Sequence, residues 1–251
     1  MKKIQLIAVL TLTFLFILSS EVFAKDKIEK NEMISEGKKR SYYLFVPKSV
    51  NKDKPVPLLV LLHGSGRDGR ILVEHWLKLA AQESIILAGP NALDSSNWYI
   101  PKDGPQFTYD LVEELKSKHP IDPRRVYLFG HSAGAITALM LSLFESEYFA
   151  ATAVSAGALS SEDYYLFDYP QRKIPVALFV GTADELFPIA KVRKTRDAFS
   201  ERKFPVELTE IPFLDHNYYS KSSEINKKAW NFLTKYQLDG APKYQQHRFK
   251  K

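Results

Sequence analysis

The sequence predicts an α/β fold in which a mostly parallel sheet is covered by helices on both faces. Short apolar runs of strand length alternate with longer segments whose apolar residues recur at helical spacing. A chain that alternates strand and helix in this way returns repeatedly to the same end of the sheet, so its strands lie parallel. No internal repeat or low-complexity linker interrupts the 251 residues, which indicates one domain spanning residues 25–251.

Each expected element is justified by its pattern. Seven segments are short and apolar, and most are rich in β-branched or aromatic residues, as expected of strands: 42–46, 58–62, 85–88, 126–129, 151–155, 176–180 and 206–211. Five segments have helical spacing: 70–84, 107–119, 132–145, 189–203 and 224–236. The segment 239–251 carries little apolar weight, and we expect it to be a flexible basic tail.

The amino terminus has the three parts of a secretory signal peptide. Lys2 and Lys3 precede an uncharged apolar run over residues 4–18, and Val22-Phe23-Ala24 provides a small residue at a cleavage site. The run is short for a membrane span. We therefore expect residues 1–24 to be removed and the protein to be secreted or periplasmic, with no stable membrane anchor.

Composition narrows the chemistry further. The chain has no cysteine, which excludes disulfides, metal-thiolate sites and a thiol nucleophile. Its net charge is +6, and basic residues gather at 38–40, 191–196 and 247–251. We interpret these clusters as solvated faces, with attraction to an anionic envelope or polysaccharide as the alternative. No nucleic-acid-binding motif accompanies them, so no nucleic-acid partner is expected.

The most informative motif is a Gly-X-Ser-X-Gly turn. Gly130-His131-Ser132-Ala133-Gly134 follows an apolar strand and opens a helical segment. A serine in this context occupies a strained strand-to-helix turn that exposes its hydroxyl, and its neighbours two positions away must be small. This pattern predicts that Ser132 is a nucleophile.

A base and an orienting acid follow Ser132 in the expected order. Asp184 lies just after one apolar strand and His216 just after the next. The order serine, acid, histidine is the one used on the α/β-hydrolase scaffold. Two alternatives stay open: Asp184 is also a potential helix cap, and Asp215 is a rival acid. The other histidines, His63, His75, His119, His131 and His247, fit the role of base less well.

The run Leu58-Leu-Val-Leu-Leu-His63-Gly64-Ser65-Gly66 predicts an oxyanion hole. Acyl transfer needs one backbone N–H from the residue after the nucleophile and one from a loop after an earlier strand. Ala133 and Ser65 are the candidates. His63 and Gly64, which end the buried strand, are predicted to contribute to substrate binding.

Aromatic residues suggest an apolar acyl pocket. Tyr164, Tyr165, Phe167 and Tyr169 crowd the segment 159–172, the candidate cover of the site. If they face the cleft together with Trp98 and Phe187, the pocket is aromatic; ordinary core packing is the alternative. Trp98 and Phe187 are therefore predicted substrate-binding residues.

Four segments together carry a family resemblance: His63-Gly-Ser-Gly, Gly89-Pro-Asn with Asn97-Trp98, Ile121-Asp-Pro-Arg-Arg-Val-Tyr127 and Gly181-Thr-Ala-Asp184. They resemble the secreted polyhydroxybutyrate depolymerase and feruloyl esterase family of α/β-hydrolases, over about residues 42–238. The resemblance implies hydrolysis of carboxylic esters through an acyl-enzyme, without a metal or other cofactor. The ester would be a polyester or an acyl group on a polysaccharide.

These observations predict a secreted serine carboxylesterase. One alternative is an esterase, phospholipase or thioesterase-like enzyme acting broadly on small acyl chains, which would share the elbow and the His-Gly turn. The other is a hydrolase-fold binding protein without activity, against which the complete serine, acid and histidine set argues.

Overall fold

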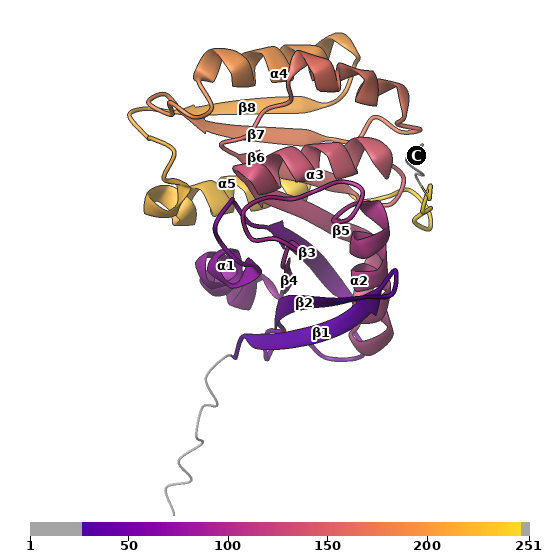
Figure 1. Ribbon diagram of the computed structural model, residues 1–251. Helices are drawn as coiled ribbons and strands as arrows, with labels where there is room; N and C mark the ends of the chain where they lie inside the picture. The colour runs from indigo at the N-terminus through magenta and orange to yellow at the C-terminus, as the bar shows by residue number, and fades with distance from the viewer. Residues whose placement is uncertain (1–26, 247–251) are drawn as a thin grey trace, which may run out of the picture.

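The computed structural model describes residues 27–246, which form one eight-stranded sheet with helices on both faces (Figure 1). The strands lie in the order β1-β2-β4-β3-β5-β6-β7-β8. The predicted signal peptide, residues 1–24, and the basic cluster at 247–251 lie outside the described residues. Within the described part, none of the helices is both long and apolar enough to cross a membrane.

The strands follow the prediction closely in the centre of the sheet and depart from it at one edge. Their bounds are β1 Glu29–Ser35, β2 Lys38–Phe45, β3 Val56–Leu62, β4 Ile86–Pro90, β5 Ile121–His131, β6 Ala151–Ser155, β7 Val176–Gly181 and β8 Val206–Ile211. Strand β1 was not predicted, because its sequence EKNEMIS is mostly polar and exposed. It forms an antiparallel edge with β2, and β2 is antiparallel to β4. All other neighbours are parallel.

The five predicted helices are present and divide between the two faces. They are α1 Gly69–Glu83, α2 Pro105–Lys118, α3 Ala133–Phe144, α4 Ile189–Glu201 and α5 Ser222–Leu233. Apolar residues of α2, α3 and α4 share one core with one face of the sheet. Those of α1 and α5 share a second core on the opposite face. Two short 3-10 helices, η1 Ser161–Asp168 and η2 Tyr218–Lys221, lie in loops.

The register of the central strands builds the site. Leu62 of β3 is aligned with Gly130 of β5, so the loop after β3 begins beside the turn that holds Ser132. Strands β7 and β8 are aligned in parallel up to Gly181 and Ile211. Because the loops after parallel strands emerge at the same edge, the segments that carry Ser132, Asp184 and His216 meet there.

The carboxyl-terminal segment differs from the predicted flexible tail. The Tyr244 ring stacks on Tyr109 with centroids 3.9 Å apart, and its hydroxyl donates to Gln106. The Gln245 N–H donates to the Glu145 carboxylate at 2.6 Å. The prediction of a flexible tail from residue 239 is therefore wrong for this part, because Tyr244 supplies a packed aromatic anchor.

The basic cluster at 38–40 also corrects a prediction, because Arg40 is not a solvated charge. Its guanidinium is buried, donates to the Asp103 carboxylate at 2.6 Å and lies over the Phe107 ring. The Asp103 carboxylate also accepts the N–H groups of Leu93 and Tyr99. This buried pair therefore ties strand β2 to the loop between β4 and α2.

Candidate active site

Ser132 occupies a left-handed turn between β5 and α3. Its φ is 56° and its ψ is −121°, a conformation that costs free energy for a residue with a side chain. The glycines on either side permit it: a Cβ on Gly130 would lie 2.2 Å from the Gly134 carbonyl oxygen, and one on Gly134 would lie 2.0 Å from that of Leu62. The predicted nucleophile elbow thus has the backbone that its sequence requires.

The structure brings Ser132, His216 and Asp184 into one hydrogen-bonded chain. His216 Nε2 lies 3.0 Å from Ser132 Oγ. On the other side of the ring, His216 Nδ1 lies 3.0 Å from Asp184 Oδ2 and 3.2 Å from Oδ1. Asp184 is buried whereas the His216 side chain is 25% exposed. The arrangement holds the imidazole with Nδ1 protonated and Nε2 facing the serine.

The Asp184 carboxylate also organises its own loop. Oδ1 accepts the N–H groups of Leu186 and Phe187 at 3.0 and 2.9 Å. These bonds resemble the capping role considered as an alternative, but they coexist with the bond to His216. Helix α4 itself begins later, with Pro188 in the capping position.

Asp215, the rival acid, has a different partner. Its Oδ1 accepts the Asn217 N–H at 2.9 Å and its side chain is exposed at the cleft. Asp215 therefore braces the loop that carries His216, and His216 Nδ1 donates to Asp184 instead.

The predicted oxyanion donors lie on the two segments that meet at Ser132. A Cβ placed on Gly64 would be 3.2 Å from Ser132 Cβ, so the loop after β3 touches the elbow. Ala133 is the first residue of α3, where backbone N–H groups lack acceptors within the helix. Gly66 donates its N–H to the Ser95 carbonyl at 2.7 Å, which fixes the turn that presents Ser65.

The structure places His63 and Trp98 differently from the prediction. His63 is buried; its Nδ1 lies 2.9 Å from the Gly64 carbonyl oxygen, and its Nε2 accepts the Ala92 N–H. The Trp98 indole N–H donates to the His63 carbonyl at 2.8 Å. Neither side chain lines the cleft. Both support the loop beneath Ser65 instead, because its buried backbone groups need hydrogen-bond partners.

Burial lowers the pKa of His63, which suits a neutral ring that donates at Nδ1 and accepts at Nε2. This ring is a structural element of the loop and is in the wrong place to exchange a proton with Ser132.

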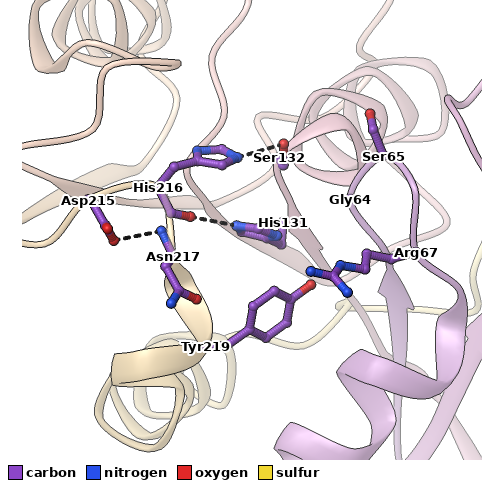
Figure 2. Close-up of a pocket in the computed structure, with 9 residues that line it drawn as sticks. All are labelled: Gly64, Ser65, Arg67, His131, Ser132, Asp215, His216, Asn217 and Tyr219. Carbon is purple, nitrogen blue, oxygen red and sulfur yellow. Dashed lines mark hydrogen bonds between the residues drawn. The ribbon is translucent and has the colours of Figure 1, made fainter.

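The cleft has a volume of about 340 Å³ and opens beside Ser132 (Figure 2). Its lining comes from the elbow, the loop after β3 and the segment that follows β8: Gly64, Ser65, Arg67, His131, Ser132, Asp215, His216, Asn217 and Tyr219. Most of these side chains are polar. Of the four predicted substrate-binding residues, Gly64 lines this cleft, whereas His63, Trp98 and Phe187 do not.

The predicted aromatic cover does not form this cleft. Phe167 of η1 packs on Phe199 and Phe204 in the core, and Tyr165 is 58% exposed. Phe187 stacks against the His216 ring at 5.8 Å between centroids without joining the lining. The condition for an aromatic pocket is therefore not met in this cleft: Phe167 follows the alternative of core packing, and Tyr165 is exposed.

His131 is a residue whose position sequence reasoning missed. Its ring is buried and donates from Nε2 to the His216 carbonyl at 3.3 Å, and no described residue contacts Nδ1 by a hydrogen bond. Burial and the neighbouring His216 lower the pKa of His131 to about 4. The available sequence signal was the position of His131 in the Gly130-His131-Ser132 turn, which the loop carrying His216 approaches.

Arg67 and Tyr219 were also missed, although both line the cleft. Each stands three or fewer residues beyond a predicted site residue, Ser65 and His216. Such proximity in sequence was the signal that could have found them. Among the described residues, no group of three or more histidine, aspartate or glutamate side chains is arranged to hold a metal ion.

Together, a nucleophile-elbow serine, a buried aspartate and a histidine at the carboxyl edge of a mainly parallel sheet define an α/β-hydrolase. The chain belongs to the dienelactone hydrolase family, whose family model matches residues 96–237.

Two curated relatives show what the chain is similar to. A bifunctional acetylxylan esterase/xylanase of Neocallimastix patriciarum is 26% identical over 65% of this chain and 25% of its own length. Poly(3-hydroxyalkanoate) depolymerase C of Paucimonas lemoignei is 30% identical over 40% of this chain and 28% of its own length. The chain spans a quarter to about half the length of the first curated relatives that it matches.

Solved structures support the fold over most of the chain. A ferulic acid esterase superposes with a TM-score of 0.68 at 19% identity, covering 84% of this chain and 98% of that one. A fluorophosphonate-binding serine hydrolase of Staphylococcus aureus gives 0.68 at 15% identity, covering 83% and 98%. At these identities the likeness concerns the α/β-hydrolase fold.

Proposed function

We propose that this protein is a serine esterase that cleaves carboxylic esters through an acyl-enzyme intermediate. The observation that carries the proposal is the 3.0 Å contact of His216 Nε2 with Ser132 Oγ, with Asp184 on the other ring nitrogen. A serine becomes a strong nucleophile when a base accepts its proton and a third group orients that base.

The geometry supports acylation of Ser132 as the first step of the proposed reaction. Ser132 Oγ attacks the ester carbonyl carbon while its proton passes to His216 Nε2. The negative oxygen that develops is stabilised by the N–H groups of Ser65 and Ala133, and the imidazolium by the Asp184 carboxylate. Collapse of the tetrahedral intermediate breaks the carbon–oxygen bond to the alcohol, which takes the proton from His216.

Deacylation repeats the same steps with water. His216 Nε2 accepts a proton from a water molecule whose oxygen attacks the acyl carbon. The intermediate collapses, the Ser132 oxygen leaves with the proton from His216, and the carboxylic acid is released. None of these steps requires a metal ion or other cofactor.

The substrate class that we propose is an ester displayed on a polyester or a polysaccharide, met after secretion. The names of the acetylxylan esterase and depolymerase relatives support this class, and the exposed side chains around the cleft suit a large substrate. Hydrolysis of small soluble acyl esters is the second candidate, favoured by the small volume of the cleft.

Replacement of the nucleophile tests the activity itself. We expect Ser132→Ala to lower turnover of p-nitrophenyl acetate by on the order of a thousandfold or more while the fold persists. A fluorophosphonate probe should label the unmodified protein and spare the variant. A folded variant that retains near-normal turnover would show that another group is the nucleophile. If the unmodified protein neither turns over esters nor accepts the probe, the alternative of an inactive binding protein gains support.

A panel of esters separates the two substrate classes. Acetylated xylan, methyl ferulate, hydroxybutyrate oligomers and p-nitrophenyl esters of increasing acyl length would be compared by kcat/KM. Higher kcat/KM on a polymer-derived ester than on p-nitrophenyl butyrate supports the polymer class. The reverse order supports the small-acyl esterase.

A further inference from the structure

The loops that follow β7 and β8 carry the acid and the base, and hydrogen bonds join these loops before either residue is reached. The two strands lie side by side at one edge of the sheet, aligned in parallel up to Gly181 and Ile211 (Figure 1). Beyond this point, the Thr182 N–H donates to the Ile211 carbonyl at 2.9 Å. The Ala183 N–H donates to the Leu214 carbonyl at 3.0 Å. The position of one loop therefore depends on the other.

The loop after β8 begins with a tight turn whose third residue has an unfavourable backbone. The Leu214 N–H donates to the Ile211 carbonyl at 3.4 Å, and Pro212 and Phe213 occupy the two central positions. Phe213 has a φ of 59°, in the left-handed region. A turn with proline second and a positive φ third usually has glycine or asparagine there, because a Cβ makes this conformation costly. The backbone of Phe213 therefore needs support from its surroundings.

The Thr182 side chain supplies this support. A residue in an unfavourable conformation persists only where neighbouring groups hold it. Packing of the Phe213 ring contributes little, because the residue is 93% exposed. The Thr182 hydroxyl oxygen instead accepts the Phe213 N–H at 2.9 Å. The bonds that Ile211 and Leu214 make in this turn join backbone atoms, so a substitution of Thr182 removes the hydroxyl contact selectively.

We propose that Thr182 is a positioning residue, which holds Phe213 in the left-handed conformation and thereby places His216 for the reaction. This inference rests on the proposed esterase function, because positioning serves the 3.0 Å contact of His216 Nε2 with Ser132 Oγ. His216 follows Phe213 by three residues, so a change of φ at Phe213 redirects the backbone that carries the imidazole. A displacement of about 1 Å at a reacting contact costs on the order of a hundredfold in rate.

Two substitutions separate the hydroxyl of Thr182 from the shape of its side chain. Thr182→Val replaces the hydroxyl with a methyl group, and we expect kcat on p-nitrophenyl acetate to fall by about tenfold to a hundredfold. KM should change little, because Thr182 does not line the cleft. Thr182→Ser keeps the acceptor and should retain most of the activity. Both variants should fold, since Thr182 is exposed and water can accept the Phe213 N–H.

The matched control makes the same chemical change nearby. Thr209→Val replaces a hydroxyl with a methyl group within β8, before the turn begins. We expect its kcat to equal that of the unmodified protein. An unchanged kcat in Thr182→Val, or an equal loss in Thr182→Val and Thr209→Val, would overturn the proposal. A loss as large in Thr182→Ser as in Thr182→Val would also overturn it, because the hydroxyl would then not be the supporting group.

A glycine at position 213 tests whether the hydroxyl acts through the unfavourable backbone. Glycine adopts a positive φ without the cost of a Cβ and needs less support there. In a Phe213→Gly background, Thr182→Val should therefore lower kcat by a much smaller factor than it does in the unmodified protein. Equal factors in the two backgrounds would overturn the proposal. A Thr182→Val protein that is less stable in urea but has unchanged kcat would show a merely structural role.

A measurement without substrate separates this proposal from the esterase function. Nitrogen-15 NMR of the histidine rings reports which ring nitrogen of His216 carries the proton. The bond to Asp184 favours Nδ1 in the unmodified protein, and we expect Thr182→Val to increase the share of the other tautomer. An unchanged share would overturn the positioning role, whether or not esters are hydrolysed. A changed share in a protein that hydrolyses no ester would support the positioning role and refute the esterase function alone.

Discussion

Two histidines that follow strands of the same sheet have opposite environments. His63 directly follows β3 and His216 follows β8. The His63 ring is buried with both nitrogens bonded to backbone groups, so its tautomer is fixed and no substrate reaches it. The His216 ring is a quarter exposed and stands between Asp184 and Ser132. The contrast teaches that placement at a strand end selects candidates, whereas exposure and side-chain partners in place of backbone partners at the ring nitrogens decide which of them can exchange protons.

The largest expected effect comes from replacing the carboxylate that orients His216. Asp184→Asn should lower kcat by on the order of ten-thousandfold, because an amide favours the wrong imidazole tautomer. Asp215→Asn should cost far less, since its bond to the Asn217 N–H can be made by an amide oxygen. Steady-state kinetics on p-nitrophenyl acetate compares the two. A larger loss at Asp215 would transfer the role of acid to that residue.

The next effect concerns the support given by His63. His63→Ala should lower stability by about 1–3 kcal/mol, because the Ala92 N–H and the loop lose buried bonds. It should also lower kcat through displacement of the loop that carries Ser65, by much less than Asp184→Asn. Urea unfolding and kinetics measure both. Loss of activity as complete as that of Ser132→Ala, at unchanged stability, would mean that His63 takes part in the chemistry.

A third effect, on stability at acid pH with no loss of turnover expected at neutral pH, separates His131 from both. Its pKa is lowered to about 4 in the folded protein from an ordinary 6.5, so the unfolded chain binds a proton over that interval while the folded chain does not. The stability that this creates is complete above pH 6.5 and is lost as the pH falls toward 4. The loss should total about 3 kcal/mol.

The matched variant is His131→Gln, in which the side chain at this position does not titrate. Its unfolding free energy should fall less steeply with decreasing pH across the same interval than that of the unmodified protein. Identical slopes in urea unfolding at several pH values would show that His131 does not carry the acid sensitivity.

Sequence patterns were sufficient to predict the strands and helices that have a regular apolar pattern. The central strands were predicted because burial on both faces makes their runs continuously apolar, as in β3. The helices were predicted because their apolar residues recur at helical spacing. The edge strand β1 was missed because half-exposed antiparallel strands tolerate polar residues. The positions of Ser132, Asp184 and His216 beside one another followed from strand-end placement, since parallel strands deliver their loops to one edge.

Burial was the information that the sequence lacked. Trp98 and Phe167 look alike in sequence as aromatic candidates for the pocket, and both are used for packing or loop support. Arg40 and Arg67 are likewise indistinguishable as single letters, yet one is a buried partner of Asp103 and the other faces the cleft. Only three-dimensional packing separates such residues.

The docked carboxyl-terminal segment bears on how the protein can be shortened or fused. A chain cut at Gly240 would uncover Tyr109 and remove the Gln245 N–H from the Glu145 carboxylate. Such a truncation would leave an exposed aromatic patch, and exposed apolar patches favour association between protein molecules. A carrier domain joined after the final residue, by contrast, would leave the Tyr244 anchor in place, on α2 and away from the residues that line the cleft.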